Sequence, residues 1–118
     1  MERAILVVED NEDDVDLTLL ALNKSHLSND LVIARDGQEA MDFLDASERA
    51  GTLPVLILLD LRLPKIDGLE VLRRIRDNER TRRLPVRRAD DLAMGDLEVR
   101  ELREAAASDD RDHLAFRA

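Results

Sequence analysis

The segment VLILLDLRLPKIDG, residues 55 to 68, carries the strongest structural signal in the chain. Its apolar run from Val55 to Leu59 ends at Asp60, which is the pattern of a buried parallel strand that emerges into a charged loop. A loop with Pro64 and Gly68 follows, and apolar residues at helical spacing then begin at Leu69, Leu72 and Ile75. The segment predicts a strand, a loop and a helix in succession.

The same order of elements occurs twice upstream. Ala4 to Val8 (AILVV) is a short apolar run that ends in a cluster of acids, and a helical pattern follows from about Asp14 to His26. Leu31 to Ala34 (LVIA) is a second short strand, and another helical pattern begins after Gly37. Three strand-helix units in a row predict an α/β fold, a doubly wound parallel sheet with helices on both faces.

Acidic residues follow two of these strands. Glu9 and Asp10 come directly after the first strand, and Asp60 comes directly after the third. Ligand sites in open α/β sheets lie beyond the carboxyl ends of the strands, so we expect the three carboxylates to meet there. Such charges repel unless a cation neutralises them, and an all-oxygen set suits Mg²⁺. A strand-end acid taken singly is more commonly a solvated loop residue, and the combination favours a site for metal-assisted phosphoryl chemistry.

Three motifs together resemble the receiver domains of two-component response regulators. They are ILVVEDNEDD (residues 5–14), ARDGQEAMDFL (34–44) and LILLDLRLPKIDGLEVLRRIR (56–76), and they are most similar to stand-alone regulators paired with phytochrome-type histidine kinases. The resemblance covers about residues 4 to 86 and implies a flavodoxin-like receiver fold. It divides the chain into a receiver-like α/β core, residues 1–86, and an atypical C-terminal segment of the same domain, residues 87–118.

The resemblance implies a role for each strand-end acid. Asp60 would be the phosphoacceptor, Asp10 a direct Mg²⁺ ligand, and Glu9 an outer ligand that acts mainly through water. The backbone carbonyl of Arg62 would be the remaining protein ligand. The Arg62 side chain would lie near the phosphoryl group, where it could pair with the acids or screen the attacking water.

The loop after Asp60 has a further implied role. In the family, the segment from Pro64 to Gly68 shapes the loop beside the phosphorylation site, with Pro64 restricting it and Gly68 supplying backbone freedom. An ordinary turn before a helix explains the same two residues equally well.

The last third of the chain departs from the family pattern. A receiver's fourth strand normally ends in Thr or Ser and its fifth in Lys-Pro, but the only lysines here are Lys24 and Lys65 and no proline follows Pro85. The fourth strand is expected at residues 86–91, but the sequence there is VRRADD. A buried strand with this sequence would contain unpaired charges. Strands four and five are therefore in doubt, and a helical or irregular segment is expected instead, with Asp96 as a candidate helix cap.

Two explanations of this tail remain open. Codons for residues 87–92, RRADDL, shifted by one base, can spell Val-Val-Leu-Thr-Thr-Ser, which would restore the missing strand and hydroxyl. We state this frameshift as a hypothesis that the gene sequence tests. Alternatively, the tail is a helical replacement that covers the sheet or pairs with a second chain, and an unpaired sheet edge would favour a homodimer.

The composition narrows the partners and the location. Of the 27 acidic and 18 basic residues, 14 acids and 4 bases fall in residues 1–60, and this acidic field disfavours nucleic acid. The arginines of residues 73–83 are better explained as a solvated helix face than as a site for an anionic partner. The apolar runs are too short to span a membrane, no signal segment opens the chain and there is no cysteine, so we expect a cytoplasmic protein.

Three functions compete. The first is a phosphorelay in which a histidine kinase phosphorylates Asp60 with Mg²⁺, and in this case the chain is not an enzyme. The second is a phosphorylation-independent interaction or dimerisation module that lacks the Thr/Lys switch. The third is a small aspartyl-phosphate phosphohydrolase, which is disfavoured because Arg62 stands where a second catalytic acid would be needed.

Overall fold

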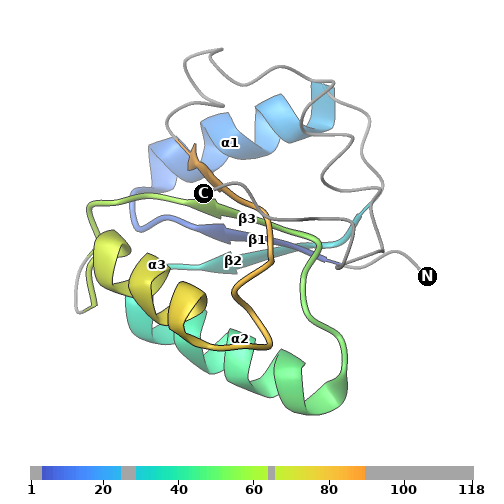
Figure 1. Ribbon diagram of the computed structural model, residues 1–118. Helices are drawn as coiled ribbons and strands as arrows, with labels where there is room; N and C mark the ends of the chain where they lie inside the picture. The colour runs from blue at the N-terminus through green and yellow to red at the C-terminus, as the bar shows by residue number, and fades with distance from the viewer. Residues whose placement is uncertain (1–3, 25–28, 64–65, 90–118) are drawn as a thin grey trace.

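The computed structural model describes residues 4–24, 29–63 and 66–89. Figure 1 shows the strands of this part of the chain lying between two helical layers. In chain order the elements are β1 (Ile5–Val8), α1 (Glu12–Lys24), β2 (Leu31–Ala34), α2 (Gly37–Ala50), β3 (Leu56–Leu59), α3 (Gly68–Asp77) and β4 (Val86–Arg88). The alternation of strand and helix confirms the α/β class predicted from the sequence.

The strands form one parallel sheet in the order β2-β1-β3-β4. β1 is paired on both sides, because Ile5 lies opposite Leu31 of β2 and opposite Leu56 of β3. α1 covers one face of the sheet, and α2 and α3 cover the other (Figure 1). This strand order with helices on both faces is the doubly wound arrangement of flavodoxin-like folds, as the sequence predicts.

Alternate residues of each central strand enter two separate apolar layers. Val7 of β1 packs in the layer that contains Leu22 of α1. Leu6 packs in the layer that contains Leu44 of α2 and Ile75 of α3. All five side chains are at most 2% exposed. Because both faces of the sheet are covered, the strands have no polar face and appear in the sequence as continuous apolar runs.

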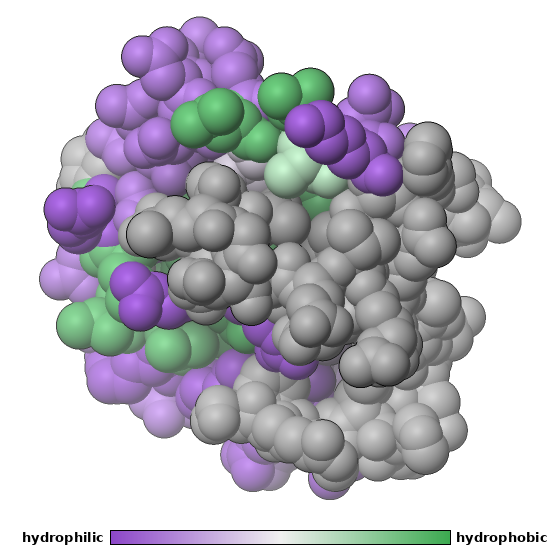
Figure 2. Space-filling view, turned by 90° about the horizontal axis from the view of Figure 1, so that it is seen from above, coloured by the Kyte–Doolittle hydropathy of each residue, from purple (hydrophilic) through white to green (hydrophobic). Residues whose placement is uncertain are grey.

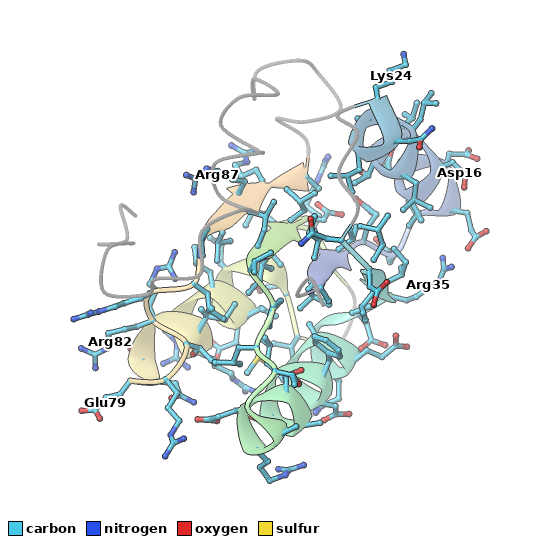
Figure 3. All side chains as sticks on the ribbon, turned by 90° about the vertical axis from the view of Figure 1, so that its right-hand side faces the viewer. Asp16, Lys24, Arg35, Glu79, Arg82 and Arg87 are labelled. Atoms are coloured by element: carbon cyan, nitrogen blue, oxygen red, sulfur yellow. The ribbon has the colours of Figure 1, made fainter. Side chains whose placement is uncertain are left out.

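The surface on the α1 side is mainly hydrophilic where described residues are visible, with hydrophobic patches between the hydrophilic residues (Figure 2). Leu17 and Leu20 of α1 are about half exposed, and scattered apolar side chains of this kind are normal on a protein surface. Asp16 and Lys24 of the same helix point away from the sheet (Figure 3). None of the described helices is both long and apolar enough to cross a membrane.

The helices begin at side chains that cap them. α1 starts two residues before the predicted Asp14, because the Asn11 side chain accepts hydrogen bonds from the backbone N–H groups of Asp13 (2.9 Å) and Asp14 (3.1 Å). Asp36 caps α2 and Asp67 caps α3 in the same way. These three polar residues fix where each helix leaves the loop that follows its strand.

The structure contains the fourth strand, which the charged residues of this segment made doubtful. Val86–Arg88 pair with β3 in parallel register, from Ile57 opposite Val86 to Leu59 opposite Arg88. Val86 and Arg87 are only half-buried and Arg88 is exposed, so the arginines are not enclosed in the core. Backbone hydrogen bonds suffice for a strand of this length at the side of the described sheet, whatever its side chains. The helix expected after Asp96 and the fifth strand concern residues 90–118, which lie outside the described residues. The shifted reading frame of residues 87–92 stays a hypothesis that the gene sequence tests.

The end of α3 is closed by a buried hydroxyl. Thr81 is 4% exposed, and its Oγ1 donates to the backbone carbonyl of Ile75 at 2.7 Å. Carbonyl groups in the last turn of a helix have no partner within the helix, so this bond satisfies one of them.

We expect Thr81→Val to lower the free energy of unfolding by about 1–3 kcal/mol, because the buried Ile75 carbonyl loses its donor. Thr81→Ser is the matched control, since it keeps the hydroxyl and loses only a methyl group, about 1 kcal/mol. Denaturant unfolding of both variants measures the difference. If Thr81→Ser costs as much as Thr81→Val, methyl packing and not the hydrogen bond holds this corner.

Candidate metal centre

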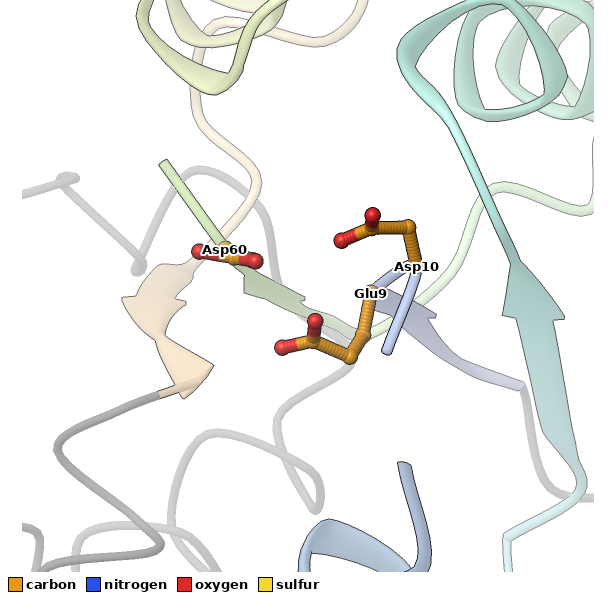
Figure 4. A group of neighbouring side chains, drawn as sticks. All are labelled: Glu9, Asp10 and Asp60. Atoms are coloured by element: carbon orange, nitrogen blue, oxygen red, sulfur yellow. The ribbon is translucent and has the colours of Figure 1, made fainter. Parts of the chain in front are cut away.

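Three carboxylates meet at the carboxyl edge of the sheet. Glu9 and Asp10 follow β1, Asp60 follows β3, and these strands are neighbours with Val8 opposite Leu59. One carboxylate oxygen from each of the three acids lies within 4.8 Å of the others. Figure 4 shows the three side chains converging from the two strand ends. The sequence-based expectation that these acids come together is therefore met.

The backbone fixes the residues that carry the carboxylates. The N–H of Glu9 donates to the carbonyl of Ala34 in β2, and the N–H of Asp60 donates to the carbonyl of Val8 in β1, both at 2.9 Å. These bonds continue the sheet by one residue beyond the strands. The acids are thus positioned by the sheet itself and not by a separate loop.

The three carboxylates differ in their contact with water. Glu9 is 1% exposed and Asp60 is 8% exposed, whereas Asp10 lies on the surface. A metal ion here could therefore contact the protein on its inner side and keep waters on its outer side. That half-open arrangement suits Mg²⁺, which loses its waters reluctantly.

Burial and neighbouring acids act together on Glu9. The pKa of Glu9 is raised to about 7, chiefly by burial, while the backbone N–H of Asn11 opposes the rise. A hydrogen bond with Asp60 and the negative charges of Asp60 and Asp14 contribute smaller increases to this value. The Asn11 N–H lies 3.2 Å from Glu9 Oε1. A divalent cation would offset the repulsion among these carboxylates, so the donor set fits such an ion.

Arg62 contributes a backbone contact to Asp60. Its N–H donates to Asp60 Oδ1 at 3.0 Å, which orients the carboxylate, while its side chain is exposed. This bond is not predicted by the sequence pattern. The assignment of the Arg62 carbonyl as a metal ligand stays a prediction, as do the separate ligand roles given to Glu9 and Asp10.

Gly68 matters for a different reason from the one expected. Among the described glycines only Gly51 has a positive φ (73°), so Gly68 uses no conformation reserved for glycine. A Cβ at Gly68 would instead overlap the carbonyl oxygen of Asp60 and the backbone of Leu61, with the Leu61 carbonyl carbon at 2.8 Å. Glycine is needed because two backbones touch. Pro64, the other expected loop residue, lies outside the described residues.

Asn11 is a supporting residue that the sequence analysis missed. Its N–H binds Glu9, and its side chain caps α1, so it joins the buried acid to the start of the helix. The available signal was an asparagine directly before an acidic first turn, which is a common helix start.

The arginine-rich segment is largely neutralised within the described chain. Arg73 and Arg74 pair with Glu70, Arg73 also pairs with Asp77, and Arg80 pairs with Glu48. Arg76 donates to backbone carbonyls. A pocket of about 570 Å³ beside this segment is lined by glutamates as well as arginines. Figure 3 shows that the side chains of Glu79 and Arg82 point away from the protein. These pairs favour a solvated surface over a site for an anionic partner.

Comparisons with known proteins agree with the geometry. The model of the response regulator receiver domain matches residues 5–94. The protein named "Probable methanogenesis regulatory protein FilR2" of Methanothrix harundinacea is 45% identical over 83 residues, or 70% of this chain and 54% of that protein. The response regulator Rcp1 of Synechocystis is 44% identical over 86 residues, or 71% of this chain and 58% of Rcp1. The match thus spans little more than half the length of either relative.

Solved structures give the same result. The bacteriophytochrome response regulator AtBRR has a TM-score of 0.71 at 39% identity, with 89% of this chain and 90% of that chain covered. The Mn²⁺-bound form of Rcp1 has a TM-score of 0.64 at 45% identity, with 71% of this chain and 62% of that chain covered.

We expect Glu9→Gln to make the metal-free protein more stable above pH 7. A carboxyl whose pKa is 4.5 when unfolded and about 7 when folded binds its proton more tightly in the folded state, so wild-type stability falls as pH rises between these values. The full cost is about 3 kcal/mol, at about 1.4 kcal/mol per pKa unit, and glutamine avoids it.

Urea unfolding in the presence of a chelator between pH 4 and pH 8 measures this effect. The gain of Glu9→Gln over wild type should be small at the acid end and should grow through the neutral range. Glu79→Gln removes an exposed carboxyl as the control. Parallel pH profiles for wild type and Glu9→Gln would contradict the cost of ionising Glu9.

Proposed function

Because the chain belongs to the family of response regulator receiver domains, we propose that Asp60 accepts a phosphoryl group from a histidine kinase, with Mg²⁺ held by the adjacent carboxylates. The observation that carries this proposal is the meeting of Glu9, Asp10 and Asp60 within 4.8 Å at the carboxyl edge of a doubly wound sheet. Rcp1, a 45% identical relative, has been solved in a Mn²⁺-bound form, which supports the binding of a divalent ion.

Each group has a defined part in the proposed transfer. An Asp60 oxygen attacks the phosphorus of the donor phosphohistidine, the new O–P bond forms as the N–P bond breaks, and the imidazole leaves with the electron pair and takes up a proton. The N–H of Arg62 holds Asp60 Oδ1 and orients the carboxylate for an in-line approach. Glu9 and Asp10 would hold Mg²⁺, which would offset the charge on the phosphoryl oxygens.

The relatives support the proposed partner. AtBRR is a bacteriophytochrome response regulator, so we assign a histidine kinase of the phytochrome type as the donor. In this role the chain is a stoichiometric phosphoacceptor of the cytoplasm and not an enzyme. A homodimer through the sheet edge stays a prediction from the sequence.

A phosphorylation-independent interaction module is the second candidate. It is favoured by the sequence, in which no Lys-Pro pair follows Pro85 and the first hydroxyl residue after Thr81 is Ser108. Those groups normally stabilise the phosphoryl charge and couple it to a rearrangement. A chain without them could keep the receiver architecture as a binding surface alone.

Incubation with acetyl phosphate and Mg²⁺, followed by intact-mass analysis, separates these functions. We expect one phosphoryl group per chain in wild type and none in Asp60→Asn, because the amide cannot serve as the acceptor. Asp42→Asn makes the same exchange on the exposed face of α2 and should label like wild type. Labelling that persists in Asp60→Asn would refute the assignment of the acceptor. No labelling of wild type would favour the interaction module, and continued turnover of acetyl phosphate would favour a hydrolase.

The lifetime of the phosphorylated state tests Arg62. We expect Arg62→Asn to shorten this lifetime several-fold, because a smaller neutral side chain no longer keeps water from the phosphoryl group. The decay of the labelled mass after removal of the donor measures it, with Arg82→Asn as the distant control. An unchanged decay rate would remove Arg62 from the description of the site.

A further inference from the structure

The first residue of α2 touches the loop that follows Asp60. Gly37 is buried, and a Cβ at this position would overlap the carbonyl oxygen of Ile66, with the Cβ of Ile66 at 2.6 Å and its carbonyl carbon at 2.8 Å. These separations are shorter than any ordinary contact between such atoms. Only a residue without a side chain fits between the start of α2 and this loop.

The same loop is attached to Asp60 by several contacts. The Arg62 N–H binds Asp60 Oδ1, and the Gly68 N–H donates to the carbonyl of Leu61 at 3.2 Å. Gly68 also packs against the backbone of Asp60 and Leu61. Between these points Leu63 is buried in the apolar layer shared with α2 and α3. A displacement at Ile66 would therefore reach Asp60 through Asp67 and Gly68, because Gly68 contacts the backbone of Asp60 and Leu61.

Of the two sides of the contact, the helix is the less able to move. The Asp36 side chain caps α2 by accepting from the N–H of Glu39 at 2.8 Å, and the Glu39 side chain accepts in return from the N–H of Arg35 at 3.0 Å. Ala40 and Leu44 anchor the following turns in the core. Ile66 is only partly buried and belongs to a loop, so an added methyl group at Gly37 would displace the loop.

We propose that Gly37 is a positioning residue for the metal and phosphoacceptor site, because its missing side chain lets Ile66 to Gly68 pack against Asp60 and Leu61 and so keeps the Arg62 amide on Asp60. The role in phosphorylation rests on the proposed function above. The mechanical part of the proposal does not, because it concerns contacts within the protein alone. Helix propensity alone predicts the opposite effect, namely that Gly37→Ala stabilises α2, since alanine is a better helix former than glycine.

Gly37→Ala tests the proposal with Gly51→Ala as its control. Gly51 lies at the other end of α2, where its φ of 73° makes alanine unfavourable but no atom lies within 4 Å of an added Cβ. Both variants should unfold more easily than wild type. Only Gly37→Ala should weaken Mn²⁺ binding, measured by calorimetry on the folded protein, by about tenfold or more, as for the loss of groups that orient metal ligands.

Amide hydrogen exchange supplies a readout that needs no metal. The N–H groups of Arg62 and Gly68 should exchange about tenfold faster in Gly37→Ala, whereas the Gly51→Ala protein should keep wild-type rates there. Wild-type Mn²⁺ affinity and wild-type exchange in a folded Gly37→Ala protein would overturn the proposal. Should wild type itself bind no Mn²⁺ and take up no phosphoryl group, the proposed function would fail, and the exchange rates would still decide whether Gly37 positions the loop.

A second variant applies where Gly37→Ala does not fold. Ile66→Gly removes the side chain on the loop side and leaves α2 unchanged, so it should lower Mn²⁺ affinity and Arg62 amide protection in the same direction. Unchanged values of both in this variant would refute the role of the contact.

Discussion

The parallel pairing of β1 with β3 is the interaction on which the candidate site depends. With Val8 opposite Leu59, the acids that follow the two strands lie side by side, and the bond from the Asp60 N–H to the Val8 carbonyl extends the pairing to the acceptor itself. A slip of one residue would turn the Asp60 side chain to the other face of the sheet. Apolar layers on both faces prevent that slip, because it would also exchange every buried side chain of the strand. The core therefore sets the position of the carboxylates.

The buried acids of the site also lower the stability of the fold. Glu9 is almost completely buried beside other acids, an arrangement that folding alone would not favour. The surrounding chain is correspondingly close-packed, since Gly68 touches the backbone of Asp60 and Gly37 touches that of Ile66. Closely packed backbone around buried carboxylates that cost stability is typical of a functional site, here one that would bind a cation.

The sequence predicts the sheet, its helices and the three carboxylates because each depends on local pattern. Strands covered on both faces must be apolar runs, and such runs end where charges begin. Other features depend on contacts between distant segments. Position 68 requires glycine because a side chain there would overlap the backbone of Asp60. The pKa of Glu9 depends on its burial and on acids from other segments. Neither property can be predicted from the residues next to it in the sequence. β4 was doubted because its arginines cannot be buried, but a short strand at the side of the described sheet needs only its backbone. The apolar spacing predicts a start of α1 at about Asp14, two residues late, because the capping role of Asn11 does not appear in that spacing.

The buried carboxyl of Glu9 has a consequence for how the site would load. With a pKa of about 7, Glu9 carries a proton in a substantial share of molecules at neutral pH. A cation bound at this site would favour the ionised form of Glu9, so metal binding would be accompanied by release of that proton. Mild acidification would then favour the metal-free site, and a higher pH would favour the metal-bound site. The proposed phosphoryl transfer, which needs the metal, would therefore depend on the pH of the surrounding compartment.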